Sequence, residues 1–442
     1  MVENSFWVLS LVSNYSSSFL VSYGYSYIFK SFLPKIKNGY LCIKITDKNY
    51  PDYQTPLEYG DKKSQTQSTI TVNNLYRFLI KVMFGGDIGF SESFILNDFE
   101  VSNLTALIKI FILNRKEMDD LDTKWAFIKH GVDRFVHFLH RNTEEGSKEN
   151  IKAHYDLSNE MFQLFLDPTM SYSSAYFKHP EETLENAQIN KVRMLINKAN
   201  LKPDEHLLEI GSGWGFLAME AVRMTGCRVT TISLSMQQVI LARERIEKAG
   251  LSDRIQVVYI DYRKLEGKFD KIISCEMLEA VGVENYPVYF ESLEKLLKPD
   301  GLAVVQFISF NDQKFEAYSK SCDFIQKYIF PGGLCPSITS IINAATENSQ
   351  LMLEHMENFG PHYATTLNRW RETFLNSQDK ILALGFDKQF IRTFDYYFSY
   401  CEAGFETRTI NLLQMVFSRP CNTKNLPLYL NSYHSQSLNI EQ

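Results

Sequence analysis

Leu207-Leu-Glu-Ile-Gly-Ser-Gly-Trp-Gly215 is the stretch that decides the fold of this 442-residue chain. An apolar run carries one acid, Glu209, and three glycines follow at every second position: Gly211, Gly213 and Gly215. This pattern predicts the first strand of a doubly wound α/β sheet, turning directly into the first helix. Because glycine has no Cβ, the backbone of such a turn can pass close to a nucleotide-like ligand.

The spacing of these glycines separates two classes of cofactor. A dinucleotide-binding loop reads G-x-G-x-x-G and has its acid about 20 residues later. Here the glycines run G-x-G-x-G, and Glu209 stands two residues before the first. No Gly-Lys-Ser/Thr follows, which argues against a P-loop. The pattern E-x-G-x-G-x-G resembles the cofactor loop of S-adenosylmethionine (SAM) methyltransferases. The alternative, a glycine-rich turn without a ligand, is disfavoured by the strand and helix patterns on either side.

The amino-acid composition of the chain argues against several kinds of binding partner. The net charge of −6 gives no basic field for nucleic acid. No uninterrupted apolar run approaches the roughly 20 residues of a membrane span, and an early Glu3 without a basic leader argues against a signal peptide. Seven scattered cysteines, none in a C-x-x-C pair, indicate a reducing compartment and predict neither a zinc site nor a disulfide framework. We therefore expect a cytoplasmic protein, without a metal, that meets membranes only peripherally.

We expect three parts: a small N-terminal domain over residues 1–145, a methyltransferase domain over 146–425 and a tail over 426–442. Within the first, helical apolar spacing occurs at Leu75–Phe84, Leu104–Leu113 and Trp125–Leu139. Gly85–Gly89 is expected to break the first helix, and the charged segment 141–150 to be a linker. Residues 1–65 are the least informative part.

From Lys202 onward, strands and helices alternate as a parallel sheet requires. Strands are predicted at 207–211, 228–234, 255–261, 271–275 and 302–309, and a late antiparallel strand at 412–419. Ser235 and Gln238 form a capping-box pattern at the start of a helix. Residues 311–400 are expected to be a mostly helical insertion over the carboxyl ends of the strands, where ligands bind in such sheets. Together these features predict a class I, Rossmann-like SAM methyltransferase.

Several stretches together resemble the cyclopropane-fatty-acyl-phospholipid synthase family, which includes the mycolic acid cyclopropane synthases. They are His154-Tyr-Asp-Leu-Ser-Asn, Met170-Ser-Tyr-Ser-Ser-Ala, the glycine loop, Ile273-Ser-Cys-Glu-Met-Leu-Glu-Ala-Val-Gly282, Phe324-Ile-Gln-Lys-Tyr-Ile-Phe-Pro-Gly-Gly333, His362-Tyr-Ala-Thr-Thr-Leu367 and Tyr400-Cys-Glu-Ala-Gly-Phe405. The resemblance spans about 145 to 420, with a weaker echo at Phe84–Ser93. The segments Gln306-Phe-Ile-Ser and Leu278-Glu-Ala-Val are most similar to plant-type members.

The resemblance implies a reaction on membrane phospholipids. The cis double bond of an acyl chain attacks the SAM methyl carbon, a carbocation forms, a base removes a proton from the new methyl, and a cyclopropane ring closes. Such a cation needs an apolar, closed pocket, because water would capture it. The resemblance further implies that bicarbonate is the base, held by Glu279, Tyr363, Ile308, Ser174 and Gln306. Two of these depart from the bacterial pattern, since Ser174 stands where Cys is usual and Gln306 where His is usual. Together these two changes favour methyl branching without ring closure as an alternative outcome.

For SAM, the resemblance implies a set of contacts from four segments. It comprises Tyr172, Ser173, Glu209, Gly211, Gly213, Gly215, Ser233, Gln238, Tyr262 and Arg263. The second strand lacks a terminal acid for the ribose, so Ser233 and Gln238 are expected to supply hydrogen bonds. Asp261 is a secondary candidate for adenine.

Three alternatives remain open. The first is a SAM-dependent methyltransferase that adds a methyl group to lipid carbon without cyclising. The second methylates a small amine. The third is a non-catalytic lipid-binding protein, which the changes at Ser174 and Gln306 would favour. The expected partner is a membrane phospholipid, met through apolar helices near 104–113 or in 311–345, and a homodimer is possible.

Overall fold

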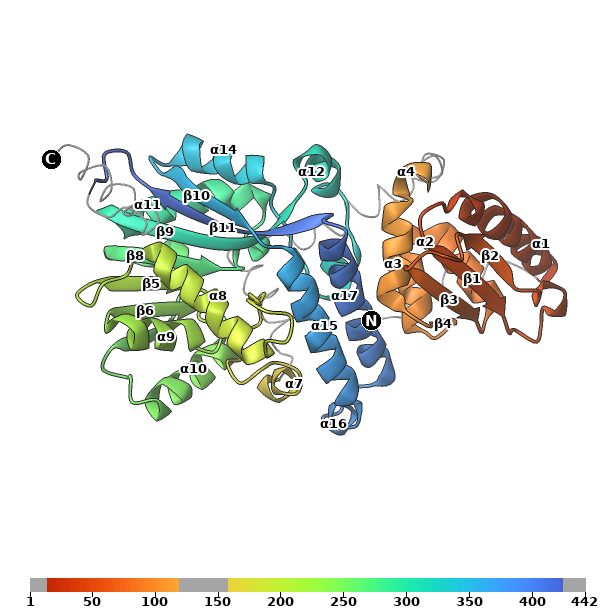
Figure 1. Ribbon diagram of the computed structural model, residues 1–442, viewed down its shortest axis with the longest axis horizontal. Helices are drawn as coiled ribbons and strands as arrows, with labels where there is room; N and C mark the ends of the chain where they lie inside the picture. The colour runs from red at the N-terminus through yellow and green to blue at the C-terminus, as the bar shows by residue number, and fades with distance from the viewer. Residues whose placement is uncertain (1–13, 119–157, 424–442) are drawn as a thin grey trace. The chain divides into compact units, whose positions relative to one another are not determined.

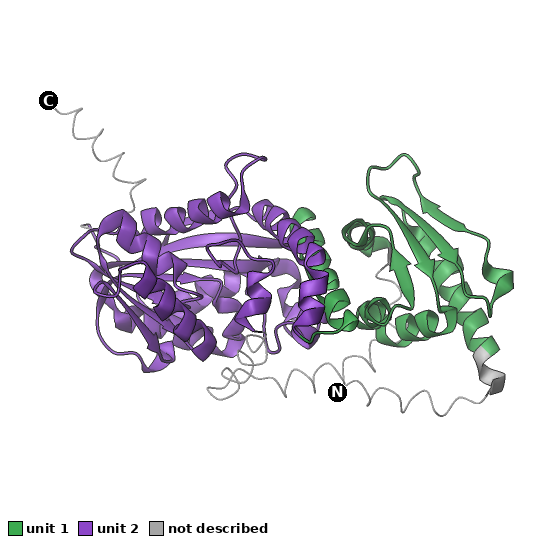
Figure 2. Cartoon of the chain, turned by 90° about the horizontal axis from the view of Figure 1, so that it is seen from below, with its two compact units in different colours: residues 1–133, 385–407 green, residues 134–384, 408–442 purple. Residues whose placement is uncertain are grey.

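The computed structural model describes residues 14–118 and 158–423, and these fall into two compact units (Figure 2). The first unit contains the N-terminal part of the chain and also residues 385–407, where the chain re-enters it. The second unit contains the remainder. The expected helix Trp125–Leu139, the expected linker 141–150, His154 and the tail 426–442 lie outside the described residues. Within the described ranges, no helix is both long and apolar enough to cross a membrane.

The first unit is built on a four-stranded sheet in the order β2-β1-β3-β4. β1 is antiparallel to β2 and parallel to β3, and β4 is antiparallel to β3. Its strands are β1 (Tyr40–Ile45), β2 (Leu57–Gly60), β3 (Gln67–Val72) and β4 (Phe99–Val101). Its helices are α1 (Asn14–Tyr25), the π-helical turn Ser26–Phe32, short 3₁₀ turns at Leu33–Lys35 and Pro51–Tyr53, α2 (Leu75–Ile95), α3 (Leu104–Leu113), α4 (Arg115–Met118) and α17 (Lys388–Glu406).

The predicted helices at 75–84 and 104–113 are both present, but the glycine-rich segment between 85 and 89 does not end α2. The helix continues to Ile95 with a kink at Gly86, whose φ of 56° and ψ of −129° are not helical. A residue without a Cβ can adopt this conformation, so the glycines bend the helix instead of stopping it.

Helix α17 is joined to the first unit by polar contacts. Thr105 Oγ1 donates a hydrogen bond to Glu402 at 2.9 Å, Arg392 Nε donates to the Phe94 carbonyl at 2.6 Å, and Lys109 pairs with Glu406 at 2.6 Å. The helix belongs to a segment that the sequence places in the methyltransferase domain.

The second unit is built on a seven-stranded sheet in the order β10-β11-β9-β8-β5-β6-β7 (Figure 1). The predicted strands are confirmed as β5 (His206–Ile210), β6 (Arg228–Ser233), β7 (Ile255–Tyr259), β8 (Phe269–Cys275), β9 (Leu297–Phe310) and β11 (Ile410–Ser418). The first five are parallel, and β11 runs antiparallel to β9 as expected. β10 (Met352–Asn358) was not predicted and lies within the segment expected to be mostly helical.

Helices cover both faces of this sheet. On one face, α8 (Leu184–Ala199), α9 (Phe216–Thr225) and α10 (Met236–Lys248) bury apolar side chains; on the other, α11 (Tyr286–Leu296) and α14 (Ile338–Asn348) do so. Leu207 packs on the first face and Leu208 on the second, because successive side chains of a strand point to opposite sides. The remaining elements are α7 (Asn159–Gln163), α12 (Asp312–Tyr318), α13 (Phe324–Tyr328), α15 (Pro361–Asn376), α16 (Gln378–Ala383) and 3₁₀ turns at Tyr262–Lys264, Leu278–Ala280 and Val283–Asn285.

The strand order locates the ligand site. From β5 the chain builds outward through β6 and β7 on one side, and then through β8 and β9 on the other. The reversal falls between β5 and β8, and open α/β sheets bind ligands at the carboxyl ends of strands at such a point.

Candidate active site

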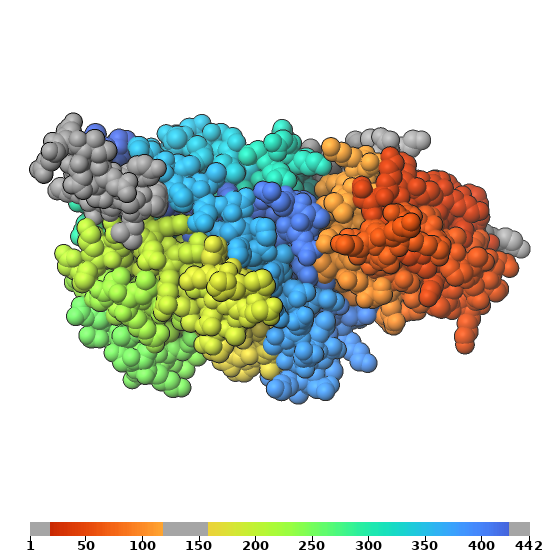
Figure 3. Space-filling view, viewed as in Figure 1, coloured from red at the N-terminus to blue at the C-terminus, as the bar shows by residue number. Residues whose placement is uncertain are grey.

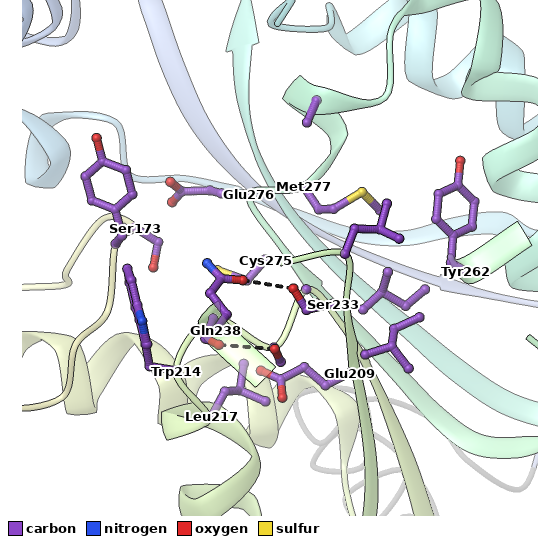
Figure 4. A pocket seen from close by; sticks show the side chains of 18 of the residues that line it. Ser173, Glu209, Trp214, Leu217, Ser233, Gln238, Tyr262, Cys275, Glu276 and Met277 are labelled. Atoms are coloured by element: carbon purple, nitrogen blue, oxygen red, sulfur yellow. Dashed lines mark hydrogen bonds between the residues drawn. The ribbon is translucent and has the colours of Figure 1, made fainter. Parts of the chain in front are cut away.

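A pocket lies at this reversal, at the carboxyl ends of β5, β6 and β8 (Figure 4). Its lining includes each of the ten residues expected to contact SAM except Gly215. Among the further lining residues that were not expected are three with ionisable side chains: Lys191, Cys275 and Glu276. The glycine loop forms one wall. Gly213 has a φ of +46°, and a Cβ placed there would meet no atom within 4 Å, so a side chain at this position would stand in the open pocket. The loop therefore leaves room for a ligand beside its backbone.

Glu209 is a buried acid in the wall of this pocket. Burial raises its pKa to about 8, and its Oε2 has no hydrogen-bond partner among the described residues. A buried oxygen without a partner carries an energetic cost that a hydrogen-bond donor in the pocket would relieve. SAM is cationic and carries such donors, so the pocket fits this cofactor.

The segment after β6 supplies hydroxyl and amide groups. Ser233 Oγ donates to Gln238 Oε1 at 2.9 Å and accepts from the Ser235 backbone N–H at 3.0 Å. Ser235 begins α10 as predicted, accepting from the Gln238 backbone N–H at 3.3 Å. The predicted capping box is only half formed, because the Gln238 side chain bonds Ser233 and does not reach back to Ser235.

Asp261 and Arg263 form the edge of the pocket after β7. Asp261 accepts from the Arg263 backbone N–H at 2.9 Å and from its guanidinium at 2.9 and 2.6 Å. Between them, Tyr262 is buried, and burial raises its pKa to about 12, so its hydroxyl stays protonated.

Residues 170–174 cover the pocket and are held by Lys191 of α8. Lys191 is 2% exposed, and its Nζ donates to Ser173 Oγ and lies 3.8 Å from Cys275 Sγ. The sequence did carry a signal for this residue. Lys191 lies four positions after Ala187 and four before Leu195, both fully buried, so it falls on the apolar face of its helix.

The same segment packs against α15. The Ala175 backbone N–H donates to Thr366 Oγ1 at 3.1 Å, and that of Phe177 donates to His362 Nδ1 at 3.1 Å. In the space-filling view, the yellow part of the chain, which includes α8, lies beside the blue part that includes α15 (Figure 3). The ring of Tyr172 lies among other aromatic rings, 5.1 Å from Phe162 and 5.2 Å from Trp370 between centroids. One side of the site is therefore aromatic, as a reaction that must exclude water requires.

Glu276, directly after β8, is the meeting point of the residues that were expected to hold bicarbonate. Its Oε1 accepts from the Ser174 backbone N–H at 3.0 Å and from Gln306 Nε2 at 2.7 Å. Its Oε2 accepts from Tyr363 Oη at 2.7 Å. Glu276 has a φ of +53°, an uncommon conformation for a residue with a side chain. Strained backbone of this kind is found preferentially at functional sites.

Glu279, the carboxylate expected at the centre, occupies a different position. It accepts from the Ile308 backbone N–H, and its Oε2 has no hydrogen-bond partner among the described residues. Burial, together with the nearby charge of Glu276, raises its pKa to about 8. Of the five residues expected around bicarbonate, three contact Glu276 and the other two contact each other. Sequence reasoning missed Glu276, although it lies in the segment that carries the resemblance.

The Gln306 side chain is oriented by a line of hydrogen bonds through the sheet. Gln306 Oε1 accepts from Gln414 Nε2 at 2.8 Å, and Gln414 Oε1 accepts from Lys198 Nζ, which also pairs with Glu357 at 2.6 Å. An ammonium group can only donate, so it fixes the orientation of the Gln414 amide, which in turn fixes that of Gln306. The NH₂ group of Gln306 is therefore directed at Glu276.

The strand order, the acid before the glycine loop and the pocket at the reversal define a class I SAM-dependent methyltransferase. The chain belongs to the mycolic acid cyclopropane synthetase family, whose model matches residues 142–415. It is 36% identical to the tuberculostearic acid methyltransferase UfaA1 of Mycobacterium tuberculosis, over 76% of this chain and 79% of that protein.

Two further relatives support the family. The chain is 39% identical to the cyclopropane-fatty-acyl-phospholipid synthase of Escherichia coli K12, over 61% of this chain and 67% of that one. The solved structure of the mycolic acid cyclopropane synthase CmaA1, complexed with SAH and CTAB, matches with a TM-score of 0.58 and 30% identity, covering 62% of this chain and 98% of that one. SAM is therefore the methyl donor, and the alternative of a non-catalytic lipid-binding protein receives no support.

Proposed function

We propose that this methyltransferase transfers a one-carbon unit from SAM to the cis double bond of an unsaturated phospholipid acyl chain and closes a cyclopropane ring. SAM would be held by Glu209, the glycine loop and the Ser233–Gln238 segment. The observation that carries the proposal is the carboxylate of Glu276, which lines the cofactor pocket and lies beside an aromatic wall. Ring closure needs a base next to the transferred methyl group and a chamber without water, and a carboxylate beside an aromatic wall supports both requirements.

The aromatic wall supports carbocation chemistry in particular. Tyr172, Trp370 and Tyr363 form a continuous series, with 5.2 Å between the first two rings and 6.1 Å between the last two. Aromatic faces attract cations and do not react with them as water does. A positive charge that develops on an acyl chain in this position would therefore be stabilised without being captured.

The experiment is expression of the chain in cells that contain unsaturated phospholipids but no such enzyme. We expect a new fatty acid methyl ester, heavier than its precursor by one CH₂, without olefinic protons in its NMR spectrum. The matched control is Gly213→Asp, which places a side chain in the cofactor pocket and should yield only the precursor. If no fatty acid gains carbon, the proposed reaction is wrong.

A second candidate is methylation of lipid carbon without ring closure. Its support is the similarity to the tuberculostearic acid methyltransferase UfaA1, which covers more of this chain than the similarity to the E. coli synthase. In the same experiment, this reaction would give a product one CH₂ heavier that keeps olefinic protons. If a reductase of the host cell then reduces it, the product is a saturated methyl-branched chain, heavier by two further hydrogens. The NMR spectrum separates the unreduced product from the ring, and the mass separates the reduced one.

We further propose a cytoplasmic enzyme that meets the bilayer peripherally, since its substrate is a membrane lipid. The two segments expected to make this contact are α3 and the insertion at 311–345. α3 buries Leu104, Leu107 and Ile110 within its own unit, so these side chains are not exposed to a membrane. The insertion is therefore the better candidate. There, Tyr328 is 37% exposed at the end of α13 and Lys327 precedes it, a pairing suited to the membrane interface. Tyr328→Ser combined with Lys327→Ser should reduce co-sedimentation with anionic liposomes; unchanged co-sedimentation would remove this segment from consideration.

A further inference from the structure

The donors expected to hold bicarbonate are already used by carboxylates of the chain itself. The Ser174 N–H, the Gln306 amide and the Tyr363 hydroxyl donate to Glu276, and the Ile308 N–H donates to Glu279. A separate anion would find few donors left, and it would lie beside the negative charge of Glu276, which disfavours it. The residues present therefore do not fit a bound bicarbonate ion.

We propose that the carboxylate of Glu276 is itself the base, fixed to the chain in the position where the resemblance places a diffusible anion. This inference rests on the proposed function, because it assigns the proton-removing group of that reaction. If Glu276 is the base, the enzyme does not need bicarbonate, and its catalytic carboxylate lies three residues before Glu279.

The surroundings of Glu276 suit a base. An ionised carboxylate has about four acceptor positions, and the hydrogen bonds of Glu276 occupy two on Oε1 and one on Oε2. One position on Oε2 is left to accept a proton. Burial raises the pKa of this carboxyl, whereas the charge of Lys191 and the three hydrogen bonds lower it. The net rise makes Glu276 a stronger base than an exposed carboxylate, and the donors favour its ionised form.

The step balances in atoms and charge. Methylation of the double bond leaves a carbocation on the acyl chain and a neutral thioether as the leaving group. Glu276 Oε2 then takes a proton from the new methyl group, and the electron pair of that C–H bond forms the carbon–carbon bond that closes the ring. Glu276 becomes a neutral carboxylic acid, and its proton passes to water once product has left and the pocket is open again.

The fixed orientation of Gln306 supports this role. A free glutamine could rotate its amide and turn a carbonyl oxygen toward Glu276, which would repel the carboxylate. The line from Lys198 through Gln414 prevents this rotation. The three donors therefore stay directed at one carboxylate through each catalytic cycle.

The test uses the full-length enzyme with phospholipid vesicles that carry cis-unsaturated chains, in buffer freed of carbon dioxide and in buffer with added bicarbonate. We expect the wild type to turn over equally in both. Glu276→Gln keeps the shape but cannot accept a proton, so turnover should fall by about 100-fold or more while SAM binding is retained. Glu284→Gln, an exposed acid eight residues later, is the matched control and should behave as wild type.

A rescue experiment distinguishes a catalytic role from a structural one. Glu276→Gly empties the position and frees its three donors, so added bicarbonate or formate should restore part of the turnover, and Glu276→Gln should not respond. A dependence of the wild type on bicarbonate would overturn the inference. So would a large loss in Glu279→Gln combined with near-normal turnover in Glu276→Gln. If the wild type itself leaves the vesicle lipids unchanged, the proposed function fails instead.

Discussion

Tyr363 Oη lies 2.7 Å from Glu276 Oε2, although 87 residues separate the two in the chain. The contact connects α15 to the turn after β8, so a helix of the insertion contributes directly to the site. Thr366, on the same helix, accepts from the Ala175 backbone N–H. The segment over the cofactor pocket, the catalytic carboxylate and α15 are therefore parts of one hydrogen-bonded arrangement.

Replacing Tyr363 by Phe should shift the pH dependence of turnover. The hydroxyl stabilises the ionised form of Glu276, so its loss raises the pKa of that carboxyl further. The active form exists above this pKa, and the acidic limb of the kcat profile should therefore move to higher pH. A hydrogen bond to a charged group contributes about 1.5–3 kcal/mol, equivalent to a shift of about one pH unit or more. An acidic limb that stays in place would show that Tyr363 does not act on the titrating group.

Replacing Gln414 by Leu should affect catalysis without contact with the substrate. The change leaves Gln306 Oε1 without its donor, leaves Lys198 paired with Glu357 alone, and frees the Gln306 amide to rotate. We expect kcat to fall by about tenfold with KM for SAM unchanged, and the free energy of unfolding to fall by about 1–3 kcal/mol.

A double-mutant cycle with Gln306→Leu checks the mechanism of this effect. If Gln414 acts through Gln306, Gln414→Leu should cause little further loss of kcat in a chain that already carries Gln306→Leu. Additive losses in kcat would mean that Gln414 acts by another route.

The scaffold could be predicted from the sequence because its signals are local. The strands of the second unit show as short apolar runs, and the glycine loop with Glu209 identifies the cofactor class within nine residues. β10 escaped prediction because it is an edge strand with mostly exposed or half-exposed residues, including Met352 and Met356, and has no strict alternation.

The choice between Glu276 and Glu279 could not be made from the sequence. Both acids follow β8 within one short turn, and the resemblance favoured Glu279. What separates them is the positive φ of Glu276 and the convergence of donors from positions 174, 306 and 363, which only the tertiary structure brings together. Spacing along the chain carries no information on such a convergence.

Glu209 should make the stability of the folded chain depend on pH. Its pKa of about 8 in the folded chain exceeds the ordinary value of 4.5 because burial disfavours the charge. Between these two values the folded state holds a proton that the unfolded state has released, so the contribution of Glu209 to the free energy of unfolding falls as pH rises through this window. Glu209→Gln should remove this contribution and be relatively more stable at pH 8 than at pH 5, as measured by urea unfolding without SAM.

The contribution of Glu209 to SAM affinity should rise with pH, whereas its contribution to the free energy of unfolding falls. An ionised Glu209 attracts a cationic cofactor more strongly, so wild-type affinity should exceed that of Glu209→Gln by a factor that grows from pH 6 to pH 8. Titration calorimetry of both proteins over this range measures the factor. A constant ratio would mean that Glu209 does not ionise when the cofactor binds.

Gly213→Ala and Gly226→Ala form a matched pair that separates backbone strain from cofactor exclusion. Both glycines have a positive φ, +46° and +76°, and an added Cβ would meet no atom within 4 Å at either position. Each substitution should therefore lower the free energy of unfolding by about 1–2 kcal/mol through the backbone alone.

Gly213 lines the pocket, whereas Gly226 ends α9 and does not. We expect SAM affinity to fall at least tenfold for Gly213→Ala and to stay at the wild-type value for Gly226→Ala, measured by calorimetry at a temperature where both variants are folded. Equal affinities would mean that the cofactor does not pass close to Gly213, and the assignment of this loop to SAM would then have to be abandoned.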